Sequence, residues 1–167
     1  MPNYHRARIP GGTYFFTVNL QDRSHTLLVD HIDVLRSAFR ATRLSLPFEI
    51  VAAAVLPDHL HCIWSLPSTA ADNVMRWRLI KTLFVKALPV TEHRSASRAR
   101  RKERGIWQRR YWEHLISDER DLRAHIDYVH LNPVKHRLVS SATDWRWSSI
   151  HRYIRAGILP KNWMESA

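Results

Sequence analysis

Two histidines one residue apart, His59 and His61, lie within the apolar run of residues 53–64. On a β-strand, residues two apart project from the same face. The two imidazoles are therefore expected to lie together, while Leu60 and Cys62 on the opposite face point into a core. Neutral imidazole is a common ligand of divalent metals, so this pattern predicts a metal site on a strand. The alternative is that both histidines are only polar residues on a solvated strand face.

Further strand signals precede this run. Residues 13–20 follow a Gly-Gly turn and are rich in aromatic and β-branched side chains, as strands are. Residues 48–55 predict another strand, and Pro57 with Asp58 forms the turn before the strand over 59–66. A turn this short favours an antiparallel hairpin. We therefore expect an antiparallel sheet that carries the two histidines.

Three helices are predicted from apolar residues at helical spacing. Asp30 is available as an N-cap of the first, Pro89 limits the second and Pro133 ends the third. The predicted helices cover residues 30–45, 70–88 and 118–132. Together with the strands, they predict an α+β domain in which helices cover at least one face of a central antiparallel sheet.

The third predicted helix carries a tyrosine four residues before an asparagine. Tyr128 and Asn132 therefore lie on one face of it, with His125 one turn earlier. Taken alone, this spacing is no evidence of catalysis, because a tyrosine that packs at the edge of a core with its hydroxyl in water has the same pattern. The pair becomes informative only in combination with other motifs.

The charge of the chain indicates an anionic partner. Lys and Arg number 26 against 15 Asp and Glu, which gives a formal net charge of +11. Nucleic acid is the commonest partner of such a protein, and an anionic membrane is the competing one. The sequence has neither an apolar run of membrane-spanning length nor a signal-peptide core. Its single cysteine, Cys62, fits a reducing compartment. We therefore expect a cytoplasmic protein with one domain over residues 1–167.

The positive charge is concentrated in residues 93–105, where six Lys and Arg stand against one glutamate. This segment has no apolar stripe, so we expect a mobile loop. Its residues Arg98, Arg100, Arg101 and Lys102 are candidates for contacts with DNA phosphates. A solvated run of charge is the alternative.

Aromatic and basic side chains alternate directly after this loop, over residues 106–114. Aromatic faces stack on bases and guanidinium groups hold phosphates, so Trp107, Arg109 and Arg110 are candidates for single-strand DNA binding. The alternative is that the aromatics are core residues between surface arginines. At least one of the two tryptophans here is expected in the core.

Taken together, these motifs resemble the REP-associated tyrosine transposases of bacteria, where REP stands for repetitive extragenic palindrome. That family is related to the single-strand Y1 transposases of the IS200/IS605 group within the HUH endonucleases. The resemblance runs from about residue 8 to residue 147 and extends into residues 144–149. The matching segments are residues 11–19, 55–64, 106–108, 111–114 and 127–136.

The resemblance implies roles for individual residues. Tyr128 matches the nucleophile, His59 and His61 match the metal-binding histidines, and Asn132 matches the third ligand. Mg²⁺ or Mn²⁺ is the implied cofactor, although imidazole ligands would equally accept zinc, nickel or cobalt. A structural zinc site is disfavoured, because the chain has one cysteine and no evident set of four ligands. The basic segment looks longer than the family minimum, which leaves the DNA path near it open.

The resemblance also implies a fold and an activity. The fold is that of a ferredoxin-like Y1 transposase domain, here with a C-terminal tail over about residues 150–167. The activity is metal-dependent nicking and joining of single-stranded DNA at REP hairpins through a covalent 5′-phosphotyrosine. The alternative is a REP-hairpin-binding protein without catalytic activity. The implied partner is a single-stranded DNA hairpin in the nucleoid, and the implied state is a monomer, with a dimer as the alternative.

Overall fold

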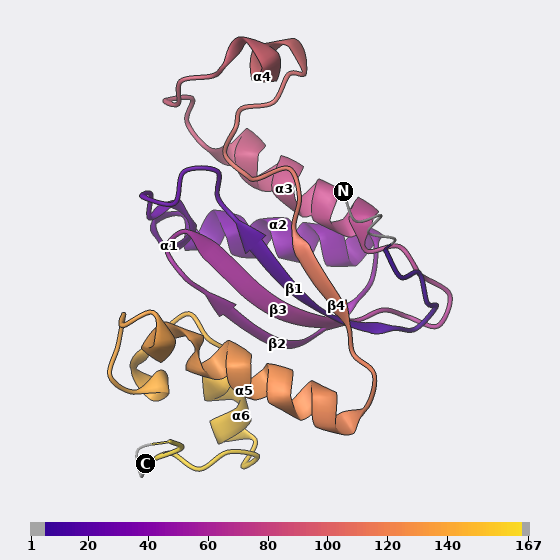
Figure 1. Ribbon diagram of the computed structural model, residues 1–167, viewed down its shortest axis with the longest axis vertical. Helices are drawn as coiled ribbons and strands as arrows, with labels where there is room; N and C mark the ends of the chain where they lie inside the picture. Colours follow the sequence, from indigo (N-terminus) through magenta and orange to yellow (C-terminus); the bar gives the residue numbers. More distant parts are fainter. Residues whose placement is uncertain (1–5, 165–167) are drawn as a thin grey trace.

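The structure, a computed structural model, describes residues 6–164 and has a four-stranded antiparallel sheet at its centre (Figure 1). The strand order is β2-β3-β1-β4, so β1 and β3 lie inside the sheet and β2 and β4 form its edges. The strands are β1 (Thr13–Asn19), β2 (Glu49–Val55), β3 (His59–Ser65) and β4 (Trp112–Leu115). The predicted hairpin of β2 and β3 is present, with Val55 opposite Leu60.

Alternation along the inner strands divides the core into two layers. Tyr14 and Phe16 of β1 join Cys62 and Trp64 of β3 in the larger buried cluster. Phe15 belongs to a second cluster on the other face of the sheet. Both inner strands are therefore buried on two sides, which is why they are apolar almost throughout.

Helices cover both faces of the sheet (Figure 1). The larger cluster is closed by α2 (Ile32–Ser45) and α3 (Val74–Ala87), and the smaller one by α5 (Glu119–Lys135). The α+β fold expected from the sequence is thus confirmed. The shorter helices are α1 (Leu27–Asp30), α4 (Ala96–Arg100), the 3₁₀ helix η1 (Ala142–Asp144) and α6 (Ile150–Arg155). Across residues 6–164 we find no helix with the length and apolar character needed to cross a membrane.

The first predicted helix is divided in two. Helix α1 ends at Asp30 and α2 begins at Ile32, so Asp30 does not cap the long helix. Its carboxylate instead accepts a hydrogen bond from the Thr26 hydroxyl at 2.6 Å. The second helix begins at Val74, four residues later than predicted, where the Asp72 carboxylate accepts from the Val74 amide at 2.8 Å. A carboxylate that satisfies a free amide of the first turn stabilises a helix start there.

Helix α5 continues past Pro133 to Lys135, contrary to the prediction that Pro133 ends it. A proline inside a helix loses the hydrogen bond that its own amide would donate, and its ring crowds the carbonyl four residues earlier, but neither effect prevents the residues after it from being helical. The chain beyond it stays helical, and the amide of His136 donates to the Asn132 carbonyl at 3.0 Å. The basic segment also differs from a plain loop, because it contains α4, capped by the Ser95 hydroxyl.

The N-cap of α5 provides a test of how that helix is held. The Asp118 carboxylate accepts from the amide of Asp121 at 2.8 Å. We expect Asp118→Ala to lower the free energy of unfolding by about 1 kcal/mol, measured by urea denaturation. Ser95→Ala is the matched control, because its 3.4 Å cap belongs to a five-residue helix with no buried residue. That substitution should change stability by less than about 0.5 kcal/mol. Equal losses in the two variants would contradict this account.

Candidate functional site

His59 and His61 lie side by side on β3, on the face of the sheet that α5 covers. Their ring centroids are 5.0 Å apart, and each residue is only 3% exposed. The ring of His61 also stacks on Phe15 of β1, a member of the core layer below α5. The period of two along the strand therefore brings the histidines together as predicted. The strand pattern did not show whether this shared face is buried or solvated, and the structure shows that it is buried.

Each imidazole is oriented through its Nδ1 atom. A hydrogen bond of 2.8 Å joins His61 Nδ1 to Thr17 Oγ1 on the neighbouring strand, and one of 2.7 Å joins His59 Nδ1 to the Asp58 carboxylate. Arg23 donates to that carboxylate at 2.6 Å and holds it in place. With Nδ1 engaged, the Nε2 atom is left for another partner. This is the arrangement by which proteins orient histidines that bind metal ions.

Burial keeps both imidazoles in their neutral, ligand-competent form. It lowers the pKa of His61 to about 3, and repulsion from His59 adds to the effect. Burial also lowers the pKa of His59, against the opposing effect of its hydrogen bond to the Asp58 carboxylate. At neutral pH a lone pair is therefore available on each ring.

Asn132 of α5 completes this group. Its side chain is fully buried, and it lies near enough to His61 that their interaction slightly opposes the fall in the histidine's pKa. Among the described residues, neither Oδ1 nor Nδ2 of Asn132, nor Nε2 of His61, has a hydrogen-bond partner. A buried polar atom without a partner costs about 1–3 kcal/mol. Two of these atoms, His61 Nε2 and Asn132 Oδ1, can bind a metal ion, whereas Asn132 Nδ2 is an N–H donor. Together with the neighbouring imidazole of His59, they fit the donor set of a divalent metal ion.

Tyr128 lies one helical turn before Asn132 and is 38% exposed. Its ring meets the edge of the His61 ring, with centroids 5.3 Å apart, and that of Phe15 at 5.8 Å. The ammonium group of Lys135 lies 4.8 Å from the centroid of the tyrosine ring. The structure therefore brings together the tyrosine, the two histidines and the asparagine that the sequence singled out.

Several neighbours of this group were not predicted. Lys135 lies two turns after Tyr128 on the same helix, a spacing that places both on one face. The ring of His136 lies 4.8 Å from that of His59. The role of Asp58 as the hydrogen-bond partner of His59 could have been suspected, because the two residues are adjacent in the sequence. Thr17 carries no such signal, because it meets His61 only through the pairing of β1 with β3.

A second group of metal-binding side chains lies at the start of α5. His114 of β4 with Asp121 and His125 of α5 could hold an ion, because their ligand atoms all lie within 4.8 Å of one another. His114 Nε2 hydrogen-bonds to one oxygen of the Asp121 carboxylate at 2.8 Å. His125 Nδ1 lies 2.9 Å from the other oxygen. Hydrogen bonds from the Ser117 amide and from His114 lower the pKa of Asp121 to about 2, so the carboxylate is ionised. The sequence pointed to His125 only as a neighbour of the tyrosine.

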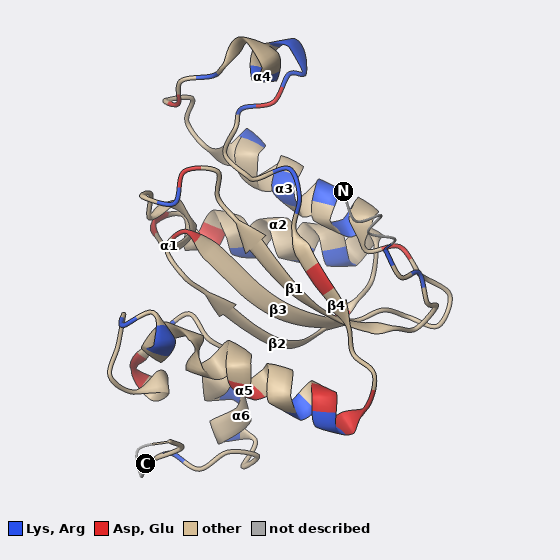
Figure 2. Ribbon diagram, in the orientation of Figure 1, with Lys and Arg blue, Asp and Glu red and all other residues tan. Residues whose placement is uncertain are grey.

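Lys and Arg residues are frequent in the segment around α4 (Figure 2), and the contacts of its arginines divide them into two kinds. Arg104 is a structural residue, which donates to the carbonyls of Val85, Leu88 and Pro89 and forms an ion pair with Glu92. Its hydrogen bonds lower the pKa of Glu92 to about 2.

The predicted DNA-contact residues of the segment are more exposed. Arg100, Arg101 and Lys102 are exposed, and Arg98 is half-buried and donates to Gln21 at 2.8 Å. The segment thus combines an anchored part with a solvent-facing one.

The aromatic part of the predicted DNA surface is not all accessible. Trp107 is only 7% exposed and packs on Phe84 with ring centroids 5.4 Å apart, so its faces are covered by the core. A side chain as large as tryptophan gains more free energy from burial against the apolar residues of α3 than it would from a position at the surface. Trp112 is 60% exposed, and Arg109 and Arg110 are also exposed. The expected core tryptophan of this segment is therefore Trp107.

Comparison with known proteins gives a consistent set of relatives. A REP-associated tyrosine transposase of Escherichia coli (strain K12) is 42% identical over 163 residues, which are 98% of this chain and 91% of the relative. A Haemophilus influenzae protein that bears the same family name is 47% identical over 165 residues, or 98% and 93% of the two chains. A solved REP-associated tyrosine transposase bound to a REP hairpin superposes with a TM-score of 0.84 at 42% identity. That match covers 98% of this chain and 91% of the other. No protein-family model matches the chain.

The two kinds of arginine predict different effects on stability. Arg104→Gln should lower the free energy of unfolding by about 1–3 kcal/mol, because partly buried carbonyls and the Glu92 carboxylate would lose their donor. Arg101→Gln, the control at an exposed position, should change it by less than about 0.5 kcal/mol. Thermal or urea unfolding of the free protein measures both. An Arg104 variant as stable as the control would show that the segment is held by other contacts.

Proposed function

The chain belongs to the REP-associated tyrosine transposases, and we propose that it nicks and rejoins single-stranded DNA at REP hairpins with Tyr128 as the nucleophile. The observation that carries the proposal is the packing of Tyr128 against His61, one helical turn from Asn132, where buried polar atoms lack partners. An exposed tyrosine hydroxyl beside neutral imidazoles suits attack on a phosphate that approaches from solvent.

The reaction is a transesterification at phosphorus. The Tyr128 oxygen forms a bond to phosphorus as the bond to the 3′ oxygen of the preceding nucleotide breaks. The hydroxyl proton is lost and the released 3′ oxygen gains one, so no net proton is consumed. A covalent 5′-phosphotyrosine results, and attack by a 3′-hydroxyl reverses the step and rejoins the strand. Since the energy of the phosphodiester is kept in the tyrosyl ester, no ATP is required.

Lys135 is suited to assist Tyr128. Tyrosine has a reference pKa of about 10, so the phenolic oxygen must become more anionic as it attacks. An ammonium group 4.8 Å from the ring centroid favours that change in charge. The same ammonium group would also lie close to a phosphate bound next to the tyrosine. We propose that Lys135 stabilises both the negative charge on the phenolic oxygen and that of the phosphate.

We propose that His59, His61 and Asn132 hold the metal ion, with Mg²⁺ or Mn²⁺ as the working cofactor. Such an ion would supply charge neutralisation and orientation at a non-bridging phosphate oxygen. Thr17 and Asp58 fix the rotation of the two rings, so the metal-facing nitrogens are set before an ion binds. The His114, Asp121 and His125 group offers a carboxylate and two imidazoles, a set that suits zinc better than magnesium.

The solvent-facing cations next to α4 are the proposed phosphate contacts of the hairpin. Arg100, Arg101 and Lys102 are exposed, and Arg98 and Arg109 border the same hollow as Lys102. Arg110, which is exposed, is the remaining candidate. Trp107 supports this surface from the core below it. Phosphate contacts of this kind position DNA and do not read its sequence.

The nucleophile is tested by Tyr128→Phe, which removes one oxygen and keeps the ring. With Mn²⁺ and a REP hairpin, the wild type should form a covalent adduct on the 5′ side of the cut, seen as a shifted band on a denaturing gel. The variant should form none and bind the hairpin as before. Tyr153→Phe is the control, because Tyr153 donates to the Val51 carbonyl on the far side of α5. Adduct formation by the Tyr128 variant would sink the assignment.

The two candidate ion sites are separated by matched substitutions. His61→Ala should lower cleavage about 100-fold or more, since a metal ion at a phosphate contributes several kcal/mol. Hairpin affinity should stay within a few-fold, because it rests on many other contacts. His114→Ala should leave cleavage near the wild-type rate. Loss of metal-dependent cleavage in His114→Ala, with cleavage kept in His61→Ala, would show that the working metal ion binds at the His114 group and not at His59 and His61.

The basic surface is tested by its salt dependence. We expect the triple variant Arg100→Gln, Arg101→Gln, Lys102→Gln to bind a hairpin more weakly. The slope of log affinity against log salt should fall by about 0.7–0.9 for each phosphate that the variant no longer neutralises. Discrimination between hairpin sequences should persist. An unchanged slope would mean that these residues are only a solvated run of charge.

A further inference from the structure

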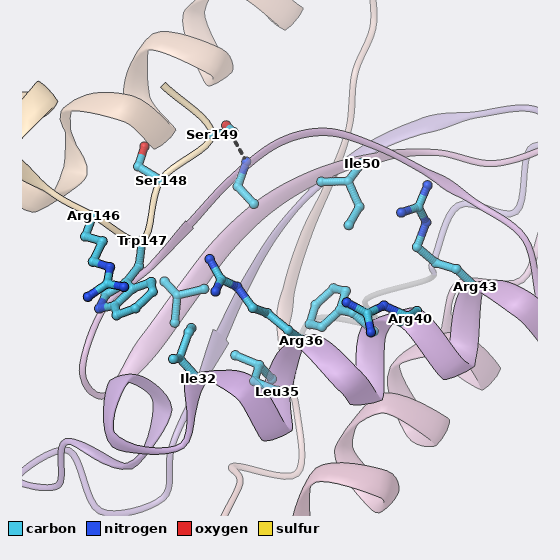
Figure 3. A pocket seen from close by; sticks show the side chains of 13 residues that line it. Ile32, Leu35, Arg36, Arg40, Arg43, Ile50, Arg146, Trp147, Ser148 and Ser149 are labelled. Carbon is cyan, nitrogen blue, oxygen red and sulfur yellow. Dashed lines mark hydrogen bonds between the residues drawn. The ribbon is translucent and has the colours of Figure 1, made fainter. Parts of the chain in front are cut away.

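A groove lies between α2 and residues 146–149 (Figure 3). Its β2 residues Ile50, Ala53 and Val55 pack on the larger core cluster, on the face of the sheet opposite His59 and His61. It has a volume of about 440 Å³, a size that suits a small ligand. Helix α2 forms one wall and residues 146–149 form the other. The floor is apolar and consists of Leu35, Phe39, Ile50 and Val55.

The rim of the groove is strongly basic. Arg36, Arg40 and Arg43 occupy consecutive turns of α2 and point to the same side, and Arg146 faces them from the other wall (Figure 3). None of the described residues that line the groove is acidic. Arg40 has no hydrogen bond or ion pair within the described part of the chain, and Arg36 has only a 3.7 Å contact with Asp33. Four like charges around an apolar floor favour an anion that has an apolar part.

Trp147 positions two of these cations. The guanidinium carbons of Arg36 and Arg146 lie 5.0 and 4.5 Å from the ring centroid of its indole. A guanidinium held over an aromatic face by cation–π attraction keeps its N–H donors free for contact with a phosphate. The stack therefore reduces the conformational entropy that binding would otherwise cost.

The wall that carries Trp147 is fixed to the sheet. The amide of Val55 donates to the Trp147 carbonyl at 2.8 Å, and the amide of Ser149 donates to the Ala53 carbonyl at 2.8 Å. The Ser149 hydroxyl also accepts from the Ala53 amide at 2.9 Å and contacts His130 of α5 at 2.8 Å. The groove is therefore a preformed feature with a rigid wall.

The groove also lies close to the proposed reaction centre. Ser148 pairs with Ala54, and Ala54 is the partner of His61 in the β2–β3 register. Two strand spacings, about 10 Å, therefore separate the backbone of Ser148 from that of His61. A single strand that leaves the proposed reaction centre could pass around residues 146–149, which cover the edge of β2 here, and so reach the groove.

We propose that this groove binds the single-stranded DNA that flanks the hairpin, with its phosphates on Arg36, Arg40 and Arg146 and a base on the apolar floor. The inference rests on the proposed function, which supplies a strand beside the hairpin. A single strand suits the groove because its bases are free to leave the backbone and enter an apolar recess, whereas those of a duplex are stacked inside.

The test uses the variant Arg36→Gln, Arg40→Gln, Arg146→Gln in the full chain. Affinities are measured for a blunt DNA hairpin, for the same hairpin with a short oligothymidine tail at its 5′ or 3′ end, and for free oligothymidine. The wild type should bind one tailed hairpin about 10-fold more tightly than the blunt one. The variant should lose most of that preference and bind the blunt hairpin as before. Its salt slope for oligothymidine should fall by about 2, or about 0.7 for each phosphate no longer neutralised.

A variant with equal loss of charge is the control: Arg120→Gln, Arg155→Gln, Lys161→Gln, all at exposed positions away from the groove. It should keep the preference for the tail. The proposal is overturned if the wild type shows no such preference, if the groove variant keeps it, or if groove and control variants lose it equally. The adduct assay tests the proposed function separately. If no covalent adduct forms but binding of oligothymidine still depends on the groove arginines, the proposed function fails while the groove proposal stands.

Discussion

The two-sided burial of β3 is the constraint on which the rest of the site depends. Every residue from His59 to Trp64 is buried, so both imidazoles are removed from water and must find partners inside the protein. Strand pairing supplies Thr17 for one ring, and the hairpin turn supplies Asp58 for the other. What remains unsatisfied, His61 Nε2, faces α5. An unpartnered buried atom costs stability, and in the proposed function that cost places ligand atoms in a dry environment, where their interaction with an ion or a phosphate is strongest.

Helix α5 connects this chemistry to the fold. Val129 packs into the small core layer while Tyr128 and Asn132, on either side of it in the sequence, face the histidines. Because all three lie on one rigid element, a shift of the helix along the sheet would move the proposed nucleophile, Tyr128, and the Asn132 amide together. The contacts at both ends of α5, with β4 through Asp121 and with residue 149 through His130, limit such a shift. Contacts remote from the tyrosine therefore contribute to the geometry around it.

The excess of positive charge is not one surface. Arg104 and Arg76 are bound to backbone carbonyls and act as struts between segments, whereas Arg100 and Arg101 face solvent and Arg36 and Arg40 border a groove. Net charge alone therefore overstates the number of cations available to DNA. Among the described residues, exposed cations gather around α4 and along α2, whereas others, such as Arg120 and Arg155, lie elsewhere on the surface. The two gatherings are consistent with a partner that has a hairpin and a flanking strand.

Local periodicity was sufficient for the parts of this protein that depend on neighbours in the chain. A period of two placed His59 with His61, a period near four placed Tyr128 with Asn132, and the short turn after β2 implied an antiparallel hairpin. Other features depend on partners far apart in the sequence, so only the tertiary structure decided them. Thr17 reaches His61 across a strand pair, Trp107 is buried by α3, and the groove exists because residues 146–149 return to the edge of β2. The reason is physical: side-chain direction is set by backbone geometry over a few residues, whereas burial and pairing are set by which surfaces the whole chain brings together.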